Sequence, residues 1–184
     1  MSLSKPQPRQ LIHTREIDCR GYARDDGLWD IEARLLDIKS YSFPNEDRGG
    51  IHAGEPIHLM RVRVTVDESL TIHEIEAVTE EAPFTICDGI NDAYRALKGE
   101  NLGPGWIRRV REVVGGVGGC THLTDLLIGP IATTAFQTVV ATGKAKEAPE
   151  DERGLPRVVN TCHALAADGP IVARLWPDYR VKAD

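Results

Sequence analysis

The segment Ile17–Leu36, IDCRGYARDDGLWDIEARLL, has the pattern of two β-strands joined by a tight turn. Its second half, Leu28–Leu36, alternates apolar and charged residues, which gives a strand one apolar face and one charged face. The dipeptide Asp26-Gly27 precedes it and favours a hairpin, because glycine accepts the positive φ that such a turn requires. We therefore predict that Leu11–Tyr22 and Leu28–Leu36 pair as antiparallel strands.

A second hairpin is predicted further along the chain. Residues 41–54, YSFPNEDRGGIHAG, are rich in turn residues and indicate an exposed loop. Strict alternation returns over Ile57–Val66 and places His58 on the inward face, at the start of the strand. A turn at residues 67–69 precedes the return strand, Leu70–Val78. Two hairpins together predict a four-stranded, mostly antiparallel sheet.

After Pro83 the apolar residues recur three and four positions apart, which is the spacing of a helix face. We predict one helix over Ile86–Leu97, with Asp88 as its N-cap and Gly99 just beyond its end. Pro104–Val114 repeats the pattern and predicts a second helix. The apolar face of this second helix comprises Trp106, Val110 and Val113.

The longest apolar segment predicts a third helix, which begins at Thr121 as N-cap and continues toward Thr142. The pair Gly129-Pro130 predicts a kink or break in it. Asp125 and several threonines interrupt the segment, so it is typical of a buried core helix and not of a membrane span. We therefore predict no membrane partner.

A sheet followed by helices is typical of an α+β fold. We predict a disordered N-terminus over residues 1–10 and a single α+β domain over residues 11–142. A charged, proline-bearing linker is predicted over 143–156, and residues 157–184 are predicted as a C-terminal tail that packs on the domain. The stretch Ile171–Trp176 predicts a short strand in that tail.

The chain carries 28 acidic and 22 basic residues among 184, and its net charge is −6. An acidic chain lacks the basic surface that sequence-independent binding to nucleic acid requires, so we predict no nucleic-acid partner. The first ten residues have no apolar core of a signal peptide, and the four cysteines form no Cys-x-x-Cys pair. We therefore expect reduced thiols and a cytoplasmic protein. The composition leaves a homodimer open.

The candidate site is centred on residues 115–123, GGVGGCTHL, where a glycine-rich bend presents Cys120 and His122 at the start of the third helix. Cysteine and histidine are the side chains best suited to bind a soft metal, and zinc accepts both. With His58 they form our predicted metal site, of His58, Cys120 and His122. Further candidate ligands are Cys87, Cys162 and His163.

Two other functions remain open on the sequence. Cys120 could act as a nucleophile with His122 or His58 as its base, so whether the protein is an enzyme is not decided. Alternatively, a non-catalytic module could bind a small molecule or a partner protein in a pocket near His58, Phe84 and Trp106. A structural role is also compatible with these residues, since a helix stop followed by a turn needs glycines in any case.

Several separated motifs resemble one bacterial family, catalogued as domain of unknown function 2889. These motifs are RDDGLWDIE at 24–32, GEPIH at 54–58, Pro83-Phe84-x-x-Cys87 and GCTHL at 119–123. The resemblance covers residues 11–140, and Cys162-His163 is also similar to members of that family. It implies a bacterial protein but no particular reaction.

A fainter likeness is to the iron–sulfur scaffold proteins of the NifU/IscU type. Those proteins also run from a β-meander into helices, and they place a ligand near the start of the meander and a cysteine at the opening of a late helix. Here Glu55 or His58, and Cys120, match those places, whereas Pro83 stands where the scaffold has its mid-chain cysteine. This likeness implies an iron–sulfur cluster as an alternative to zinc.

Overall fold

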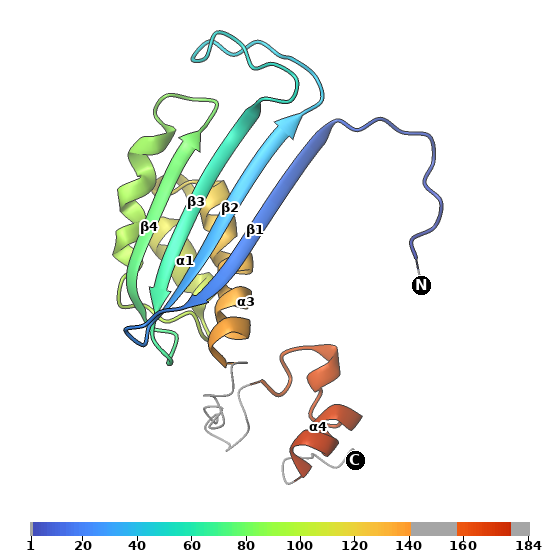
Figure 1. Ribbon diagram of the computed structural model, residues 1–184, viewed down its shortest axis with the longest axis vertical. Helices are drawn as coiled ribbons and strands as arrows, with labels where there is room; N and C mark the ends of the chain where they lie inside the picture. The colour runs from blue at the N-terminus through green and yellow to red at the C-terminus, as the bar shows by residue number, and fades with distance from the viewer. Residues whose placement is uncertain (1, 141–157, 178–184) are drawn as a thin grey trace. The chain divides into compact units, whose positions relative to one another are not determined.

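The computed structural model describes residues 2–140 and 158–177, which are coloured in Figure 1. By their contacts the residues divide into two compact units, Met1–Thr138 and Val139–Asp184. The first unit contains the sheet, most of the helices and the candidate site. The two units are described separately below.

The first unit is built on one four-stranded sheet in which every pair of neighbouring strands is antiparallel. The strands follow one another in the order of the chain, β1-β2-β3-β4. Two hairpins followed by helices confirm the predicted α+β class. The strands are β1 (His13–Ala23), β2 (Trp29–Lys39), β3 (Pro56–Val66) and β4 (Ile72–Glu81).

The alternation in β2 orients the sheet. Trp29, Ile31, Ala33 and Leu35 are buried on the inner face, and the residues between them are only partly buried on the outer face. Removing this apolar surface from water is the main favourable term in folding. The turn before β2 contains Gly27 with a φ of 86°, which is the positive value that the sequence predicted.

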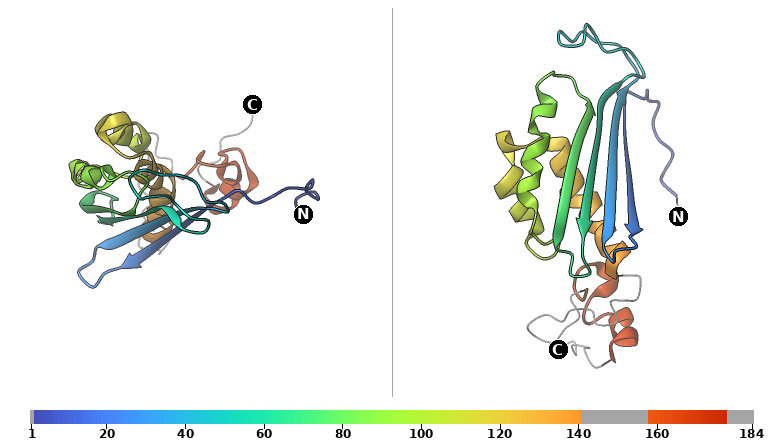
Figure 2. Two further views of the ribbon diagram at one scale, coloured as in Figure 1. Left: turned by 90° about the horizontal axis from the view of Figure 1, so that it is seen from above. Right: turned by 60° about the vertical axis from the view of Figure 1, so that its left-hand side comes forward.

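The helices of the first unit cover the inner face of the sheet (Figure 2). The first of them, η1 (Cys87–Leu97), is a 3₁₀ helix that packs against β4, and α1 (Trp106–Val114) follows it. The N-cap of η1 is Ile86, so the prediction of Asp88 was wrong. In α1 the buried residue of the last turn is Val114 and not the predicted Val113, because the buried residues of this helix, Trp106, Val110 and Val114, recur every four positions.

The third predicted helix is one helical run from Thr121 to Val140 that contains two π-helical stretches. Its N-cap is Cys120, one residue before the predicted Thr121. Pro130 does not break the run, because it lies within a wider π-helical turn, η3, that accommodates the missing N–H. The successive pieces are α2 (Thr121–Leu126), η3 (Leu127–Ile131), α3 (Ala132–Ala135) and η4 (Phe136–Val140).

Among the described residues this run is the only helix long and apolar enough to cross a membrane by length and composition. The core helix of a water-soluble domain passes the same test. Four of its apolar residues are fully buried, namely Leu123, Leu126, Leu127 and Ile131. The α2 piece contacts β2 and β3, and the η3 piece contacts β1 and β2. These contacts favour the core-helix interpretation.

The second unit has a small core of its own, formed by Val159, Ala167 and Val172. It contains a short 3₁₀ turn, η6 (His163–Leu165), and one helix, α4 (Pro170–Leu175). The predicted strand at Ile171–Trp176 was therefore wrong. Pro170 occupies the first turn of α4, where proline favours a helix start because its missing N–H has no partner there anyway. The predicted linker, 143–156, lies outside the described residues.

Candidate functional site

A polar cluster interrupts the apolar inner face of the sheet near the end of β2. Its centre is Asp37, which continues the inward parity of the buried β2 residues and is 1% exposed. In the strand register Asp37 lies directly opposite Arg15 of β1 and directly opposite His58 of β3. Three neighbouring strands thus each contribute a polar side chain at the same level of the sheet.

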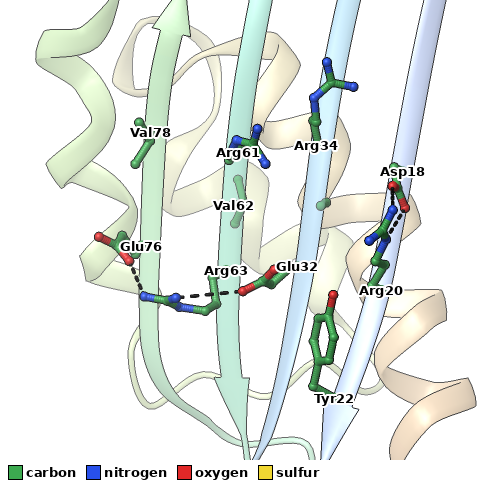
Figure 3. Close-up of a pocket in the computed structure, with 11 residues that line it drawn as sticks. Asp18, Arg20, Tyr22, Glu32, Arg34, Arg61, Val62, Arg63, Glu76 and Val78 are labelled. Atoms are coloured by element: carbon green, nitrogen blue, oxygen red, sulfur yellow. Dashed lines mark hydrogen bonds and ion pairs between the residues drawn. The ribbon is translucent and has the colours of Figure 1, made fainter.

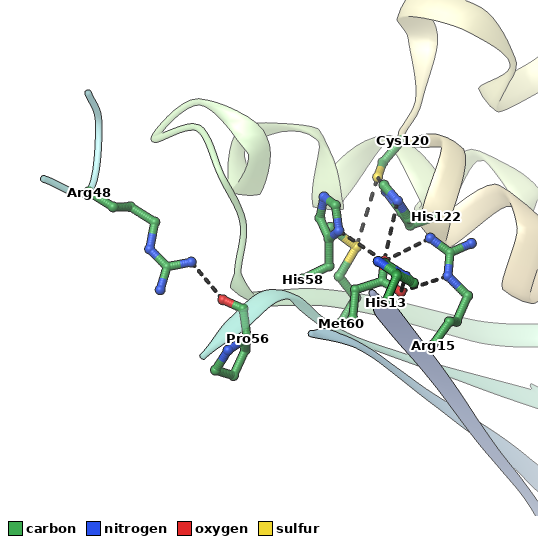
Figure 4. Close-up of polar contacts among 9 residues, drawn as sticks. His13, Arg15, Arg48, Pro56, His58, Met60, Cys120 and His122 are labelled. Atoms are coloured by element: carbon green, nitrogen blue, oxygen red, sulfur yellow. Dashed lines mark hydrogen bonds and ion pairs between the residues drawn. The ribbon is translucent and has the colours of Figure 1, made fainter. Parts of the chain in front are cut away.

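The carboxylate of Asp37 accepts four hydrogen bonds (Figure 4). Arg15 donates from Nε at 2.8 Å and from Nη2 at 2.7 Å, which is a bidentate pair. His13 Nε2 lies 3.1 Å from Oδ1, and His58 Nδ1 lies 3.0 Å from Oδ2. Because an ionised carboxylate only accepts, both imidazole nitrogens carry their hydrogen, and Nε2 of His58 is left with a free lone pair.

Opposing effects determine the charge of Asp37. Burial alone would raise its pKa, but the hydrogen bonds and charge of Arg15, with the hydrogen bonds of His58 and His13, lower that pKa to about 2. Asp37 is therefore ionised at neutral pH. Its charge is compensated by Arg15, whose side chain is 36% exposed and links the cluster to solvent.

Two imidazoles lie together beside this carboxylate. The ring centroids of His58 and His122 are 3.8 Å apart and the rings are inclined by 34°. His122 Nε2 lies 3.7 Å from Asp37 Oδ2. Burial lowers the pKa of both histidines, and the charge that His58 would carry lowers the pKa of His122 further. Both rings are thus neutral at neutral pH, which is the form that binds metals.

Cys120 adds a thiol to the same place. Its Sγ lies 3.8 Å from Nδ1 of His122 and 3.9 Å from Sδ of Met60, a β3 residue that is 1% exposed (Figure 4). Met60 is two residues beyond His58 and shares its inward parity on β3. The thiol, the thioether and an imidazole therefore converge at the start of α2.

The main chain at Cys120 is held from both sides by one hydroxyl. Tyr94 Oη accepts a hydrogen bond from the Cys120 N–H at 2.8 Å and donates one to the Cys120 carbonyl at 2.9 Å. The preceding residue, Gly119, packs so closely that a Cβ there would lie 2.0 Å from the Val114 carbonyl oxygen. Part of the glycine-rich bend is thus required by close approach of the backbone.

The structure places His122 beside each of the other two predicted ligands: its ring centroid lies 3.8 Å from that of His58, and its Nδ1 lies 3.8 Å from Cys120 Sγ. Neither Cys120 nor Cys87, which opens η1, is part of the group of donor atoms that lie within 4.8 Å of one another, namely those of Asp37, His58 and His122. The other two candidate ligands, Cys162 and His163, belong to the second unit, so their participation stays a prediction. That three of the predicted residues bind a metal also stays a prediction.

Asp37, Arg15, Met60 and His13 were not among the residues that the sequence predicted for the site. Strand parity contained the information, since Asp37 continues the buried positions of β2. The pocket predicted near His58, Phe84 and Trp106 is not supported by the positions of its aromatic residues. Phe84 is 58% exposed, whereas Trp106 is buried and donates from Nε1 to the Leu127 carbonyl at 2.9 Å. A ligand-binding role stays a prediction.

The outer face of the sheet carries charged side chains instead of an apolar core. A pocket of about 410 Å³ lies there, and Figure 3 shows the side chains that line it, with the ion pairs among them as dashed lines. Arg63 of β3 bridges Glu76 of β4 at 2.6 Å and Glu32 of β2 at 3.8 Å, whereas Arg20 pairs with Asp18 within β1. These side chains are largely exposed, so their pairs contribute little and are typical of a solvated face.

The fold and the inner cluster define a class of protein: an α+β domain whose sheet and late helix surround a buried carboxylate, two imidazoles and a thiol. The family model for the protein of unknown function DUF2889 matches residues 13–137, and the chain belongs to this family. The match confirms the resemblance carried by the motifs. Comparisons with curated proteins and with solved structures found no match. The likeness to NifU/IscU-type scaffolds is not shown and stays a prediction.

Proposed function

We propose that this protein binds a transition-metal ion at the inner cluster. The observation that carries the proposal is the meeting of His58 and His122 beside Asp37, with donor atoms of all three residues within 4.8 Å of one another. The three residues come from β2, β3 and α2, so the fold and not local sequence brings them together. Donors that share one metal lie about 3.3–4 Å apart, since metal–ligand bonds are about 2.0–2.3 Å long.

The hydrogen bonds of Asp37 suit a supporting role. Metal-bound histidines commonly donate their second N–H to a carboxylate, which orients the ring and raises the basicity of the other nitrogen. His58 already makes this bond to Asp37, and its Nε2 is free for a metal. His122 and Cys120 then supply the nitrogen and sulfur ligands that zinc accepts. An iron–sulfur cluster is less well supported, because clusters are held mainly by cysteines and Cys120 is the only cysteine described beside these histidines.

The test measures binding of Zn²⁺ by competition with a chromophoric chelator, together with metal content after purification. We expect one ion per chain in the wild type and at least a tenfold weaker affinity in His58→Ala and in His122→Ala. The matched control is His73→Ala, which removes an exposed histidine near the start of β4 that pairs with Asp67. Equal affinity in the wild type and in a His58→Ala/His122→Ala double variant would refute the proposal.

A second candidate function is cysteine-dependent catalysis, and one observation favours it. The Sγ of Cys120 is 3.8 Å from His122 Nδ1, and His122 Nε2 is 3.7 Å from Asp37, which is the order nucleophile, base and orienting carboxylate. Selective alkylation of Cys120 under native conditions would support it. Protection of the same thiol by added Zn²⁺ would assign the residue to the metal site instead. Cytoplasmic location and a homodimer stay predictions.

A further inference from the structure

We propose that the ion bound at this site is Cu(I), held by the sulfur atoms of Cys120 and Met60 together with the imidazole of His122. The inference rests on the proposed function and specifies its metal. Met60 is the one buried thioether in the described residues, and its Sδ faces the only thiol of the cluster.

The geometry of the sulfur side fits a single small ion. The Cys120 Sγ is 3.9 Å from Met60 Sδ and 3.8 Å from His122 Nδ1. Two sulfurs bound to one metal at about 2.3 Å with angles near 120° lie about 4 Å apart, and a sulfur and a nitrogen lie about 3.7 Å apart. Both distances measured from the Cys120 sulfur therefore match those between donors that share one metal. Figure 4 shows all three side chains directed toward the same space.

The softness of the available donors separates Cu(I) from harder ions. The oxygens of Asp37 are occupied by Arg15, His13 and His58, so a hard cation would have to displace those partners. The donors that remain are thiolate, thioether and imidazole. Thiolate and thioether ligands select Cu(I), and a thioether adds little to a site for zinc, whose protein ligands are thiolate, imidazole and carboxylate.

The charges of the cluster also suit a monovalent ion. The negative charge of Asp37 is balanced by the guanidinium of Arg15, which pairs with it at 2.7 Å. Binding of Cu⁺ to the Cys120 thiol releases one proton to solvent, and the resulting thiolate balances the ion. A divalent ion in the same place would leave one uncompensated positive charge beside Arg15, which is costly where the side chains are mostly buried.

The experiment measures Cu(I) affinity in the absence of oxygen by competition with bathocuproine disulfonate, and Zn²⁺ affinity in parallel on the same proteins. Met60→Leu keeps the volume of the side chain and removes the thioether. We expect it to weaken Cu(I) binding at least tenfold and to change Zn²⁺ affinity less than twofold. Cys120→Ser should weaken Cu(I) binding further. Cys19→Ser is the matched control, because Cys19 is a half-buried thiol of β1 outside the cluster, and it should leave Cu(I) affinity unchanged.

The outcomes separate the two proposals. Zn²⁺ binding without Cu(I) binding, or Cu(I) binding that Met60→Leu does not weaken, would overturn the copper assignment and leave the proposed function standing. Failure to bind either ion would overturn both. X-ray absorption of the Cu(I)-loaded wild type gives a reading that does not depend on a folded variant. Two sulfur neighbours would support the assignment, and a shell of nitrogen and oxygen alone would contradict it.

Discussion

Replacement of Asp37 by asparagine tests how the inner cluster is held. The folded chain lowers the pKa of Asp37 from 3.8 to about 2, and a shift of nearly two units corresponds to about 2.5 kcal/mol of preference for the ionised form. Asparagine has nearly the same shape but no charge, and its amide would place a donor against Arg15 or a histidine. We therefore expect Asp37→Asn to lower the free energy of unfolding at pH 7 by about 2–3 kcal/mol. For a chain of this size that is about 5–10 °C in melting temperature.

Urea unfolding followed by circular dichroism measures this difference, and its pH dependence identifies the cause. Because the pKa of Asp37 is lowered on folding from 3.8 to about 2, its contribution is complete above about pH 5 and is lost progressively as pH falls from about 5 toward about 1. The gap between wild type and Asp37→Asn should therefore close over that interval. Glu32→Gln is the control on the same strand, because Glu32 is 46% exposed and pairs with the half-exposed Arg63, so it should change stability by less than about 1 kcal/mol. Equal stability of Asp37→Asn and the wild type at pH 7 would refute the reasoning.

Three further predictions concern the elements that position the cluster. Gly119→Ala should lower the free energy of unfolding, measured in urea, by about 1–3 kcal/mol, because the new Cβ would lie 2.0 Å from the Val114 carbonyl oxygen. Gly118→Ala is the control and should be nearly neutral, because a Cβ at that position lies 3.8 Å from its nearest neighbour. Tyr94→Phe should cost about 1–3 kcal/mol in the same assay, because the N–H and carbonyl of Cys120 lose their shared partner; an unchanged midpoint would contradict this role of the hydroxyl. Stability should fall as pH decreases below 6.5, because the pKa of His122 is lowered on folding and its neutral ring is favoured above that pH. His122→Ala should reduce the pH dependence of the free energy of unfolding between pH 7 and 5. An unaltered pH dependence in this variant would mean that other groups cause the loss of stability.

The fold could be predicted because the information that specifies it is local. Alternation in Leu28–Leu36 and Ile57–Val66 identified two inward faces, and the glycine turn identified the hairpin. The tail was different, since the apolar and basic residues of Ile171–Trp176 fit a strand and a helix about equally over so short a stretch. There Pro170 at the first helical position was the deciding residue. The 3₁₀ geometry of η1 had no marker in the sequence.

The site could be predicted only in part, because its centre depends on strand register. A two-residue turn at Asp26-Gly27 would place Asp37 opposite Glu16, which would leave two carboxylates facing each other. The observed turn spans residues 24–28 and shifts the pairing by one residue, so that Asp37 faces Arg15 instead. On the other side of β2, Asp37 pairs with His58 of β3. A long loop joins these two strands, and its length does not determine which residues pair. Parity could show which face each residue occupies but not which residues meet.

The way Asp37 is compensated also determines which side of the cluster can hold an ion. A buried carboxylate without a partner would itself attract a cation, but Arg15 occupies both of its oxygens and supplies the balancing charge. The carboxylate is then left to orient His58 through Nδ1, which turns the free nitrogen away from Asp37. The donor atoms that do not take part in these hydrogen bonds are the nitrogens and sulfurs at the start of α2. The same salt bridge that stabilises the sheet thus moves the coordinating role from oxygen to softer atoms, and this is the physical link between the fold and the proposed choice of metal.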